Sequence, residues 1–324
     1  MPEHWGLDFA QPLHTRAEGA TDPRNNKVAD GTTVVVTGAG KGLGYAIATS
    51  YALAGAKGIV ISSRTQSDLD KLQQEIETIS PKTVVLSQIC DTQKASDVRA
   101  LAEATKEKFG RADIVVANAG IISKYIKDED GKERMPESLV EDDDFDRVIE
   151  TNLMGSYRVA KYFVPLLIDA KSGPQAYICI TSTAAHLNDS QLCPAAYNLS
   201  KIGNDRMVEH LHHDHHAKDG LQAFAVHPGA VLTPQTERHH ETQRGSLWTD
   251  SKWCMPIARG IWADRNAVLK DDVGLCGGFL TWLTKERRDW LSGRHLVANW
   301  DVGALLKRKQ EIVDGDKLVF KMVV

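Results

Sequence analysis

The sequence is sparing with cysteine and shows no pattern of paired thiols. Its five cysteines are scattered along the chain at Cys90, Cys179, Cys193, Cys254 and Cys276. They are odd in number, and none forms a Cys-x-x-Cys pair. This usage argues against a disulfide scaffold or a zinc finger and favours reduced thiols. We therefore expect a cytoplasmic protein.

Strong net charge and long apolar runs are also absent. The net charge is −4 over 324 residues, so no overall field attracts nucleic acid or an anionic membrane. No uninterrupted apolar stretch is long enough to cross a bilayer, and residues 1–30 lack the apolar core of a secretory signal. We expect neither a nucleic-acid nor a membrane partner. Residues 1–30 are interpreted as a polar arm without chemistry, pinned to the body by Trp5, Leu7 and Phe9.

What the sequence does contain is a regular alternation of short apolar runs and amphipathic stretches. We predict strands at 33–37, 58–62, 83–88, 112–117, 176–181, 221–227 and 294–299. Helices are predicted at 45–54, 66–79, 93–109, 145–170, 195–217 and 271–284, and a surface loop at 123–144 with a turn at Asp130-Gly131. The pattern predicts an α/β fold, a Rossmann-like doubly wound parallel sheet of about seven strands with helices on both faces. One domain would cover residues 31–303.

The first strand runs into a glycine-rich turn, Gly38-Ala39-Gly40-Lys41-Gly42-Leu43-Gly44, and then into a helix. Strand, turn and helix in this order present free backbone N–H groups and a helix N-terminus to a phosphate. Glycines are needed because a Cβ would block the close approach of a pyrophosphate. The segment therefore predicts a dinucleotide site.

The residues after the second strand indicate which dinucleotide is bound. An acid there, about 20 residues past the glycines, would accept a hydrogen bond from the 2′-hydroxyl of NAD. This chain has Ser63-Arg64 instead, and Arg64 can bond a 2′-phosphate with Lys41 as a second cation. NADP(H) is thus favoured over NAD(H). The alternative is that both cations are simply solvated.

Tyr197 and Lys201 lie four residues apart on one face of a predicted helix. A nearby cation favours the phenolate and lowers its pKa from about 10. Such a pair can exchange a proton with an alcohol or ketone oxygen. The same spacing is also common on solvated helix faces, so the pair needs support from other segments.

Taken together and in this order, the motifs resemble those of the short-chain dehydrogenase/reductase family over about residues 31–300. Thr37, Gly38, Gly42 and Gly44 match its Thr-Gly-x-x-x-Gly-x-Gly turn; Asn118-Ala119-Gly120 matches its Asn-Ala-Gly segment; Pro228-Gly229 with Thr233 matches its Pro-Gly segment; and Asn152, Ser182, Tyr197 and Lys201 match its catalytic tetrad. The C-terminal stretches 275–282 and 298–301 resemble fungal members.

The resemblance implies reversible hydride transfer between nicotinamide C4 and a ketone or secondary alcohol carbon. Tyr197 would donate the proton and Ser182 would orient the oxygen. Lys201 would lower the phenol pKa and bond the nicotinamide ribose. Asn152 would hold a water that connects Lys201 to solvent, and Thr233 would bond the carboxamide.

The expected cofactor contacts are Thr37, Gly38, Gly40, Lys41, Gly42, Leu43, Gly44, Ser63, Arg64, Asp91, Thr92, Asn118, Ala119, Gly120, Tyr197, Lys201, Pro228, Gly229, Val231 and Thr233. Asp91 would accept from the adenine amino group or, alternatively, cap the helix that starts near Thr92. No metal is expected. His212 and His216 have a zinc-compatible spacing without a third ligand nearby, and Asp142-Asp143-Asp144 suits a helix N-terminus.

The substrate is expected to be a small carbonyl compound or alcohol. Three tryptophans in 234–270, Trp248, Trp253 and Trp262, suggest a lid for a bulky apolar ring ketone of fungal biosynthesis, or else pack that lid on the sheet. Compared with the family it resembles, the chain has a slightly longer loop between Ser182 and Tyr197 and a long loop after Asn118, and both are expected to border the substrate.

Other functions remain open. They are an NAD(H)-dependent alcohol dehydrogenase working oxidatively, a nucleotide-sugar epimerase, whose Gly-x-x-Gly-x-x-Gly spacing fits less well, and a non-enzymatic NADP-binding sensor. The C-terminal segment, residues 304–324, ends in an apolar run from Leu318 to Val324 and is expected to dock on the body or on a partner subunit. The family resemblance implies a homodimer or homotetramer.

Overall fold

The computed structural model of the protein describes residues 5–124, 126–127, 133–134, 144–188, 190, 192–236 and 269–322. Several predictions fall outside these residues: the turn at Asp130-Gly131, Asp142 and Asp143, Cys254, and the lid beyond residue 236 with its three tryptophans. The cysteines within the described residues form no disulfide. No helix in the described ranges has both the length and the apolar composition that a membrane span requires.

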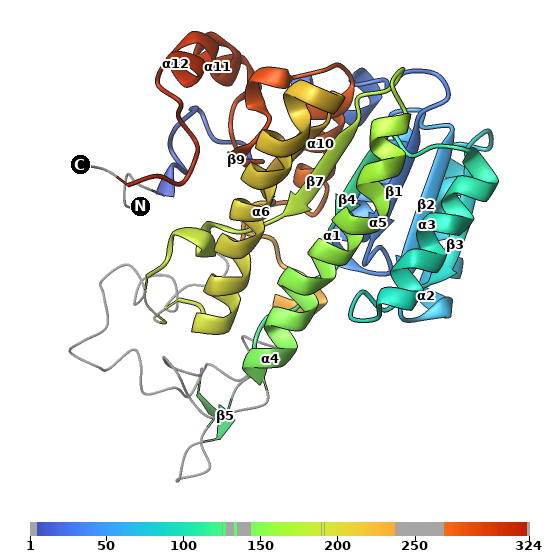
Figure 1. The fold of residues 1–324 in the computed structure, drawn as a ribbon, viewed down its shortest axis with the longest axis horizontal. Coiled ribbons are helices and arrows are strands. Elements are labelled where there is room, and N and C mark those ends of the chain that lie inside the picture. The colour runs from blue at the N-terminus through green and yellow to red at the C-terminus, as the bar shows by residue number, and fades with distance from the viewer. Residues whose placement is uncertain are drawn as a thin grey trace.

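Seven strands form the central sheet in the order β3-β2-β1-β4-β7-β8-β9 (Figure 1). They are β1 (Thr33–Thr37), β2 (Gly58–Ser63), β3 (Val84–Ile89), β4 (Ile114–Ala117), β7 (Ala176–Ile180), β8 (Gln222–His227) and β9 (Arg294–Val297). Every pairing between them is parallel. The strand order reverses between β1 and β4, which places a crevice at the carboxyl ends of these strands. This confirms the predicted doubly wound α/β fold.

Alternate residues of each strand face opposite helical layers, because strand side chains have a period of two. On one face Val34 and Val36 belong to a core with α1 (Gly42–Leu53), α2 (Gln66–Ile79) and α10 (Gly274–Thr284). On the other face Val35 belongs to a core with α3 (Ala95–Phe109), α5 (Gly155–Asp169) and α6 (Ala195–Asp219). The β-branched run in β1 is therefore buried on both sides, as expected for a central parallel strand.

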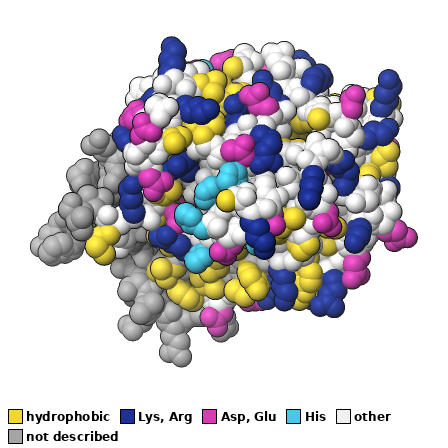
Figure 2. Space-filling view, turned by 45° about the horizontal axis from the view of Figure 1, so that its top comes forward, with side chains coloured by type: hydrophobic (Ala, Val, Ile, Leu, Met, Phe, Trp, Pro, Cys, Tyr) yellow, Lys and Arg dark blue, Asp and Glu magenta, His cyan; other side chains and the backbone are white. Residues whose placement is uncertain are grey.

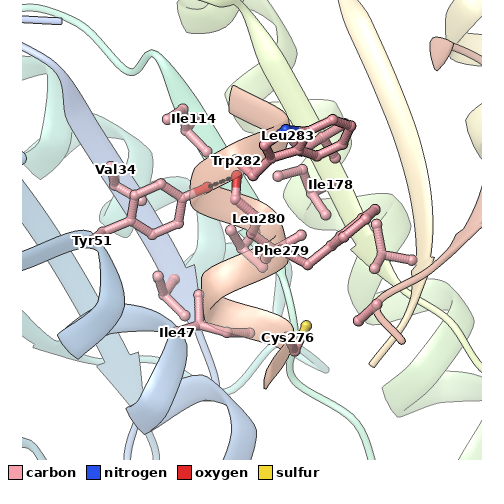
Figure 3. Packing of buried hydrophobic residues seen from close by; sticks show 14 of the residues in the cluster. Val34, Ile47, Tyr51, Ile114, Ile178, Cys276, Phe279, Leu280, Trp282 and Leu283 are labelled. Atoms are coloured by element: carbon pink, nitrogen blue, oxygen red, sulfur yellow. Dashed lines mark hydrogen bonds between the residues drawn. The ribbon is translucent and has the colours of Figure 1, made fainter. Parts of the chain in front are cut away.

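Figure 3 shows the first of these cores, where α10 lies against α1 and the sheet. Phe279 and Leu280 are fully buried there beside Ile47 and Ile178. The one polar atom of Tyr51 is satisfied within this layer, since its hydroxyl donates to the carbonyl of Leu280 at 3.3 Å. A rigid layer of this kind holds the N-terminus of α1, and hence the glycine turn, at the edge of the sheet.

The predicted helix 145–170 is three segments, which corrects the expectation of one continuous helix. They are α4 (Asp144–Ile149), the π-helical turn η4 (Glu150–Met154) and α5. The wider turn surrounds Asn152, whose side chain bonds the neighbouring loop instead of facing solvent. Single π turns of this kind often mark functional positions.

Several other boundaries differ from the predictions by up to three residues, such as the start of α1 at Gly42 instead of residue 45. Helix α10 starts at Gly274 instead of residue 271, because Asp271 pairs with Val231 in an isolated bridge and the Asp272 side chain accepts from Gly274 N at 2.8 Å. The predicted loop at 123–144 contains two short paired strands, β5 (Ile126–Lys127) and β6 (Glu133–Arg134).

The N-terminal arm is bound to the far end of the chain. The indole nitrogen of Trp300 donates to the carbonyls of Gly6 at 3.2 Å and Leu7 at 3.0 Å. The Phe9 ring lies 5.6 Å from the Trp300 ring, and the Arg308 guanidinium lies 3.6 Å from the centroid of Phe9. Two short helices, α11 (Val302–Lys307) and α12 (Lys309–Asp314), follow at the β9 side of the sheet (Figure 1). Residues 5–10 are thus part of the folded body.

Candidate active site

A cleft of about 1220 Å³ runs along the carboxyl edge of the sheet. Its wall contains every residue predicted to bind the cofactor except Thr37, together with Ser182, Tyr197 and Lys201 of the predicted tetrad. Thr37 and Asn152 lie behind this wall and are fully buried. The structure therefore brings residues from the carboxyl ends of six strands, β1, β2, β3, β4, β7 and β8, to one place.

The glycine turn is packed too tightly to accept side chains. A Cβ at Gly44 would lie 2.4 Å from the Gly38 carbonyl oxygen and 2.5 Å from Nδ2 of Asn118. A Cβ at Gly38, which has φ +66°, would lie 2.8 Å from Cα of Ala119. The Asn118 amide donates to the carbonyls of Thr37 at 2.9 Å and Gly38 at 3.2 Å. This cradle without side chains at the start of α1 fits a pyrophosphate.

Thr37 supports the cradle from inside. Its hydroxyl oxygen accepts from the backbone N–H groups of Asn118 at 3.2 Å and Ala119 at 3.3 Å. Thr37 thereby joins the end of β1 to the segment after β4.

The end of β2 carries the two cations that were predicted to recognise a 2′-phosphate. Arg64 is exposed on the cleft wall. Lys41 is also mostly exposed, but its ammonium lies 3.2 Å from the carboxylate of Asp68, in the first turn of α2. The hydroxyl of Ser63 forms hydrogen bonds with the backbone of Thr65, to whose carbonyl it donates and from whose N–H it accepts. The predicted pair of cations is thus present together with a carboxylate that the sequence did not indicate.

Asp91 lies on the wall beyond β3. Its Oδ1 accepts from Gln93 N at 3.1 Å, which closes a turn before α3. Since α3 begins at Ala95, the expectation that Asp91 caps a helix starting near Thr92 is wrong.

Ser182, Tyr197 and Lys201 meet beside the end of β7. Ser182 caps the single 3₁₀ turn η5 (Thr183–His186), where its hydroxyl oxygen accepts from Ala184 N at 3.1 Å. Tyr197 lies in the first turn of α6, and its phenol shares a hydrogen bond with the Ser182 hydroxyl. The Lys201 ammonium donates to the carbonyl of Ile180 at 2.9 Å and lies 5.4 Å from the centroid of the Tyr197 ring.

Burial dominates the protonation of this pair. It raises the pKa of the Tyr197 phenol, with a smaller contribution from Cys193, while the bond to Ser182 acts in the opposite direction. Burial also lowers the pKa of the Lys201 ammonium. Burial thus outweighs the predicted lowering of the tyrosine pKa by Lys201, whose ammonium is directed at the Ile180 carbonyl. At neutral pH the phenol is therefore a proton donor.

Asn152 holds the segment after β4. Its Oδ1 accepts from Ile121 N at 2.8 Å, and its Nδ2 donates to the Ile121 carbonyl at 2.9 Å and to Oγ of Ser200 at 3.1 Å. A Cβ on Gly120 would lie 3.4 Å from Asn152 Oδ1 and 3.8 Å from Lys201 Nζ, so Gly120 separates these two side chains. The role of Asn152 in holding a water stays a prediction.

His227 is a site residue that the sequence reasoning missed. It ends β8, lies on the cleft wall, and accepts from Thr183 N at 3.2 Å through its Nδ1. Burial, together with His295, His186 and Lys201, lowers the pKa of His227 to about 3, so the ring stays neutral and can accept. The sequence feature that could have identified His227 as a site residue is its position directly before Pro228-Gly229.

Asp271 was also missed. Its Oδ2 accepts from Ala230 N at 2.7 Å and from Nδ2 of Asn299 at 2.9 Å. A Cβ on Gly229, where φ is +97°, would lie 2.8 Å from the same oxygen. The carboxylate thereby fixes the Pro228–Thr233 segment against the end of the sheet. Gly42 lies close to the far end of that segment, since its Cβ would be 3.4 Å from Cγ2 of Thr233.

The N-terminal arm, for which the sequence indicated no role in the site, contributes to the cleft wall. Leu13, His14 and Thr15 line the cleft, as do Trp5 and Leu7. The backbone of His14 bonds Asn299 in both directions, with His14 N donating at 2.7 Å and the carbonyl accepting from Asn299 Nδ2 at 2.9 Å. The arm thus closes the cleft on the side of the Pro228–Thr233 segment.

Figure 2 shows histidine side chains gathered on one face, and neither His212 nor His216 of α6 lines the cleft. His212 stacks on His216 with ring centroids 4.7 Å apart, and its Nδ1 lies 2.9 Å from Oγ of Ser292. Within the described ranges, no three metal-binding side chains come together. These histidines bond neighbouring groups of the fold instead.

Comparison with known proteins agrees with this geometry. The model of the family described as short chain dehydrogenase matches residues 32–244. The chain belongs to the short-chain dehydrogenase/reductase family. It is an oxidoreductase that uses a nicotinamide cofactor and acts on small molecules, as the members of this family do.

Relatives of this short-chain dehydrogenase match along nearly the whole chain. It is 36% identical to the short chain dehydrogenase pgmD of Aspergillus terreus over 334 residues, covering 100% of this chain and 96% of the relative. It is 32% identical to the short chain dehydrogenase mpl6 of Monascus purpureus over 297 residues, covering 91% and 89%. The resemblance to fungal members is confirmed.

Solved structures share the fold. Levodione reductase matches with a TM-score of 0.66 at 20% identity, covering 83% of this chain and 96% of that one. A 3-ketoacyl-(acyl-carrier-protein) reductase of Brucella melitensis, solved with NADH, matches with a TM-score of 0.62 at 25% identity, covering 82% and 96%. The first of these likenesses concerns the fold alone.

Proposed function

We propose that the protein is an NADP(H)-dependent oxidoreductase that interconverts a ketone and a secondary alcohol, with a bulky apolar ring compound of biosynthesis as substrate. The observation that carries the proposal is the meeting of Ser182, Tyr197 and Lys201 on the wall of a cleft that also contains the glycine cradle. The size of the cleft and its apolar side chains, among them Leu13, Leu187, Leu192 and Leu269, support a large apolar substrate.

The residues of the chain position the substrate and protonate its carbonyl oxygen. When bound, the nicotinamide supplies or accepts the hydride. Tyr197, kept protonated by burial, donates its proton to the carbonyl oxygen of the substrate as that oxygen gains charge. Ser182 donates a second hydrogen bond to the same oxygen and fixes its direction. Lys201, held by the Ile180 carbonyl, provides positive charge beside the developing phenolate.

The phosphates and ribose are held by the remaining wall. Backbone N–H groups of the glycine turn at the start of α1 would bind the pyrophosphate. Asn118, Ala119 and Gly120 would border the adenosine side, and Thr233 would bond the carboxamide. Lys201 would also bond the nicotinamide ribose, by family resemblance.

Substitution of Tyr197 tests the catalytic assignment. Tyr197→Phe removes the proton donor and leaves the ring, so we expect turnover to fall by about 10² to 10⁴ while NADPH still binds. Turnover would be followed by NADPH absorbance with a panel of ring and open-chain ketones, and binding by NADPH fluorescence. Near-normal turnover in this variant would refute the assignment.

The cofactor preference is tested separately. Arg64→Ala and Lys41→Ala remove the proposed partners of the 2′-phosphate, so KM for NADPH should rise by about tenfold or more while KM for NADH changes little. Lys71→Ala, an exposed cation on α2 that does not line the cleft, is the matched control. A wild-type enzyme that prefers NADH contradicts the proposal.

One observation favours the alternative of an NAD(H)-dependent alcohol dehydrogenase. The Asp68 carboxylate lies on the cleft wall, 3.2 Å from Lys41, where it can accept from a ribose hydroxyl while neutralising that cation. On this alternative Asp68→Ala weakens NADH binding, whereas on the NADP(H) proposal it strengthens NADPH binding by freeing Lys41.

The proposal includes a cytoplasmic homodimer or homotetramer. Exposed apolar side chains on α5 and α6, namely Tyr157, Leu199 and Ile202, support an association surface. Light scattering after size exclusion would test it, since a monomer at micromolar concentration is incompatible with this assembly.

A further inference from the structure

We propose that Asp205, one turn along α6 from Lys201, is a positioning residue whose negative charge keeps the Lys201 ammonium protonated beside Tyr197. The inference rests on the proposed function in one respect: the positive charge of Lys201 is taken to stabilise the phenolate that forms at Tyr197. Asp205 does not line the cleft, so it acts on the reaction only through Lys201.

Lys201 and Asp205 are two buried charges on one face of α6. They are four residues apart and therefore share that face, where Lys201 is 6% and Asp205 2% exposed. Both act on the thiol of Cys179 in β7: burial raises the pKa of this thiol to about 11, Lys201 lowers it and Asp205 raises it. Burying a charge is costly unless an opposite charge lies nearby. Each of these two charges therefore needs the other, or another partner.

The direct hydrogen-bond partner of each charge is a neutral group or a histidine. The Lys201 ammonium donates to the carbonyl of Ile180 at 2.9 Å. Oδ2 of Asp205 lies 2.9 Å from Nδ1 of His295, and Oδ1 has no hydrogen-bond partner among the residues that the structure describes. The protonation of His295 thus decides whether the Asp205 charge is already compensated.

The surroundings of His295 favour its neutral form. Its side chain is 6% exposed, and within the described ranges its Nε2 has no hydrogen-bond partner. A proton on Nε2 would therefore be a buried donor without an acceptor, which is unfavourable. The neutral ring carries its proton on Nδ1 and donates it to Asp205. His295 thereby fixes the carboxylate in place and leaves its negative charge uncompensated.

Within the described part of the chain, the elements packed against α6 offer Lys201 no other uncompensated carboxylate. They carry the titratable side chains of Tyr177 and Cys179 on β7, His227 on β8, His295 on β9 and His186 in η5, and none of these is negative at neutral pH. The buried or half-buried carboxylates on these elements are Asp144 of α4 and Glu150 of η4, which pair with Arg147 and Arg158. Asp205 is therefore the counter-charge of Lys201.

Asp205 opposes the effect of burial on Lys201. Burial lowers the pKa of the Lys201 ammonium, while Cys179 and Asp205 act in the opposite direction. Because Cys179 keeps its proton at neutral pH, the carboxylate of Asp205 is the charge that raises the pKa of Lys201 there. Loss of this carboxylate should leave Lys201 protonated only at lower pH.

The test uses a conservative variant and a matched control. Asp205→Asn removes the charge and keeps an oxygen that can accept from His295. Glu209→Gln is the control, because Glu209 is a buried carboxylate on the same helix that is paired with Arg206. It lies eight residues beyond Lys201, about 12 Å along the helix axis. Both variants remove one buried carboxylate from α6, but only the first removes the counter-charge.

The pH dependence of kcat, with a ketone and NADPH, is the first measurement. Burial raises the pKa of Tyr197 and lowers that of Lys201, so loss of turnover at high pH reports deprotonation of Lys201. In Asp205→Asn this loss should begin about one pH unit lower, or more. In Glu209→Gln it should begin at the wild-type pH. A purely structural role of Asp205 would instead lower kcat equally at every pH.

Urea unfolding at pH 7 gives a second measurement, which does not depend on activity. Lys201→Met and Asp205→Asn each leave one buried charge without its counter-charge, so each should lower the urea midpoint. The double variant Lys201→Met/Asp205→Asn removes both charges and should unfold at a urea concentration no lower than Asp205→Asn alone. Combining Lys201→Met with Glu209→Gln should give additive losses.

The two measurements separate this inference from the proposed function. If the wild type reduces no ketone, the proposed function fails, and the unfolding of the single and double variants still decides whether Asp205 compensates Lys201. Additive losses for Lys201→Met and Asp205→Asn overturn the inference. So does a loss of turnover at high pH that begins at the same pH in Asp205→Asn and in the wild type.

Discussion

Replacement of Asp271 by alanine tests what holds the Pro228–Thr233 segment. The change leaves two part-buried N–H groups, on Ala230 N and on Asn299 Nδ2, without the carboxylate that accepts from both, while Asn299 Nδ2 keeps its other bond to the His14 carbonyl. Each unsatisfied donor costs about 1–3 kcal/mol, so the free energy of unfolding should fall by about 2–6 kcal/mol. For a chain of this size the melting temperature should drop by roughly 4–12 °C, at about 2 °C per kcal/mol.

The same change should weaken cofactor binding, because the loosened segment is proposed to hold the nicotinamide end. We expect KM for NADPH to rise about tenfold, which corresponds to about 1.4 kcal/mol. Asp271→Asn keeps one acceptor oxygen and should fall between wild type and Asp271→Ala in both measurements.

The neighbouring Asp272 provides the control. Its side chain accepts from Gly274 N at 2.8 Å in an exposed position, so Asp272→Ala should cost about 0.5–1.5 kcal/mol and leave KM for NADPH unchanged. Thermal unfolding by circular dichroism and NADPH kinetics would be compared across the three variants. If Asp271→Ala loses no more stability than Asp272→Ala, the buried carboxylate does not hold the segment and the reasoning is wrong.

Three other predictions follow from the cleft. Gly44→Ala puts a Cβ 2.4 Å from a carbonyl oxygen of the same turn and should abolish NADPH binding by fluorescence titration, while Gly31→Ala, where φ is +84° and space is open, should bind normally. The pKa of His227 is lowered to about 3 in the folded protein, so below about pH 6.5 the unfolded chain binds a proton at this histidine and the folded protein does not. Stability should therefore fall as the pH drops from 7 to 4. The urea midpoint of unfolding measures this fall, which should be less steep in His227→Asn. Leu13→Trp adds bulk on the cleft wall and should raise KM for a ring ketone at least about fivefold with KM for NADPH unchanged, whereas the exposed Gln11→Trp should change neither.

The parts of this fold that were predictable are those encoded by neighbouring residues. The run Thr33–Thr37 is β-branched and apolar because β1 is buried on both faces, and the glycines follow because the turn has no room for a Cβ. Helix α2 was placed at its observed ends, Gln66 and Ile79, since its apolar residues recur at helical spacing. Local patterns of this kind need no knowledge of distant contacts.

The meeting of Ser182 with Tyr197 was expected only through the family resemblance, because spacing alone does not place a turn against a helix. Asp271 and the arm went unrecognised for a related reason: their partners are remote in sequence, as in the bond between His14 and Asn299. The environment of Tyr197 was misjudged because helical spacing reports the distance to Lys201 but not the depth at which both lie.

The hydrogen bonds between the N-terminal arm and Trp300 also affect the order in which parts of the protein fold during synthesis. Gly6 and Leu7 bond a residue made 294 and 293 positions later. At about 5–20 residues per second, the arm waits roughly 15–60 s during synthesis before its docking partner exists. Trp5 and Leu7 lack this docking partner for that time, so the part of the cleft wall that the arm contributes can form only after Trp300 has been made.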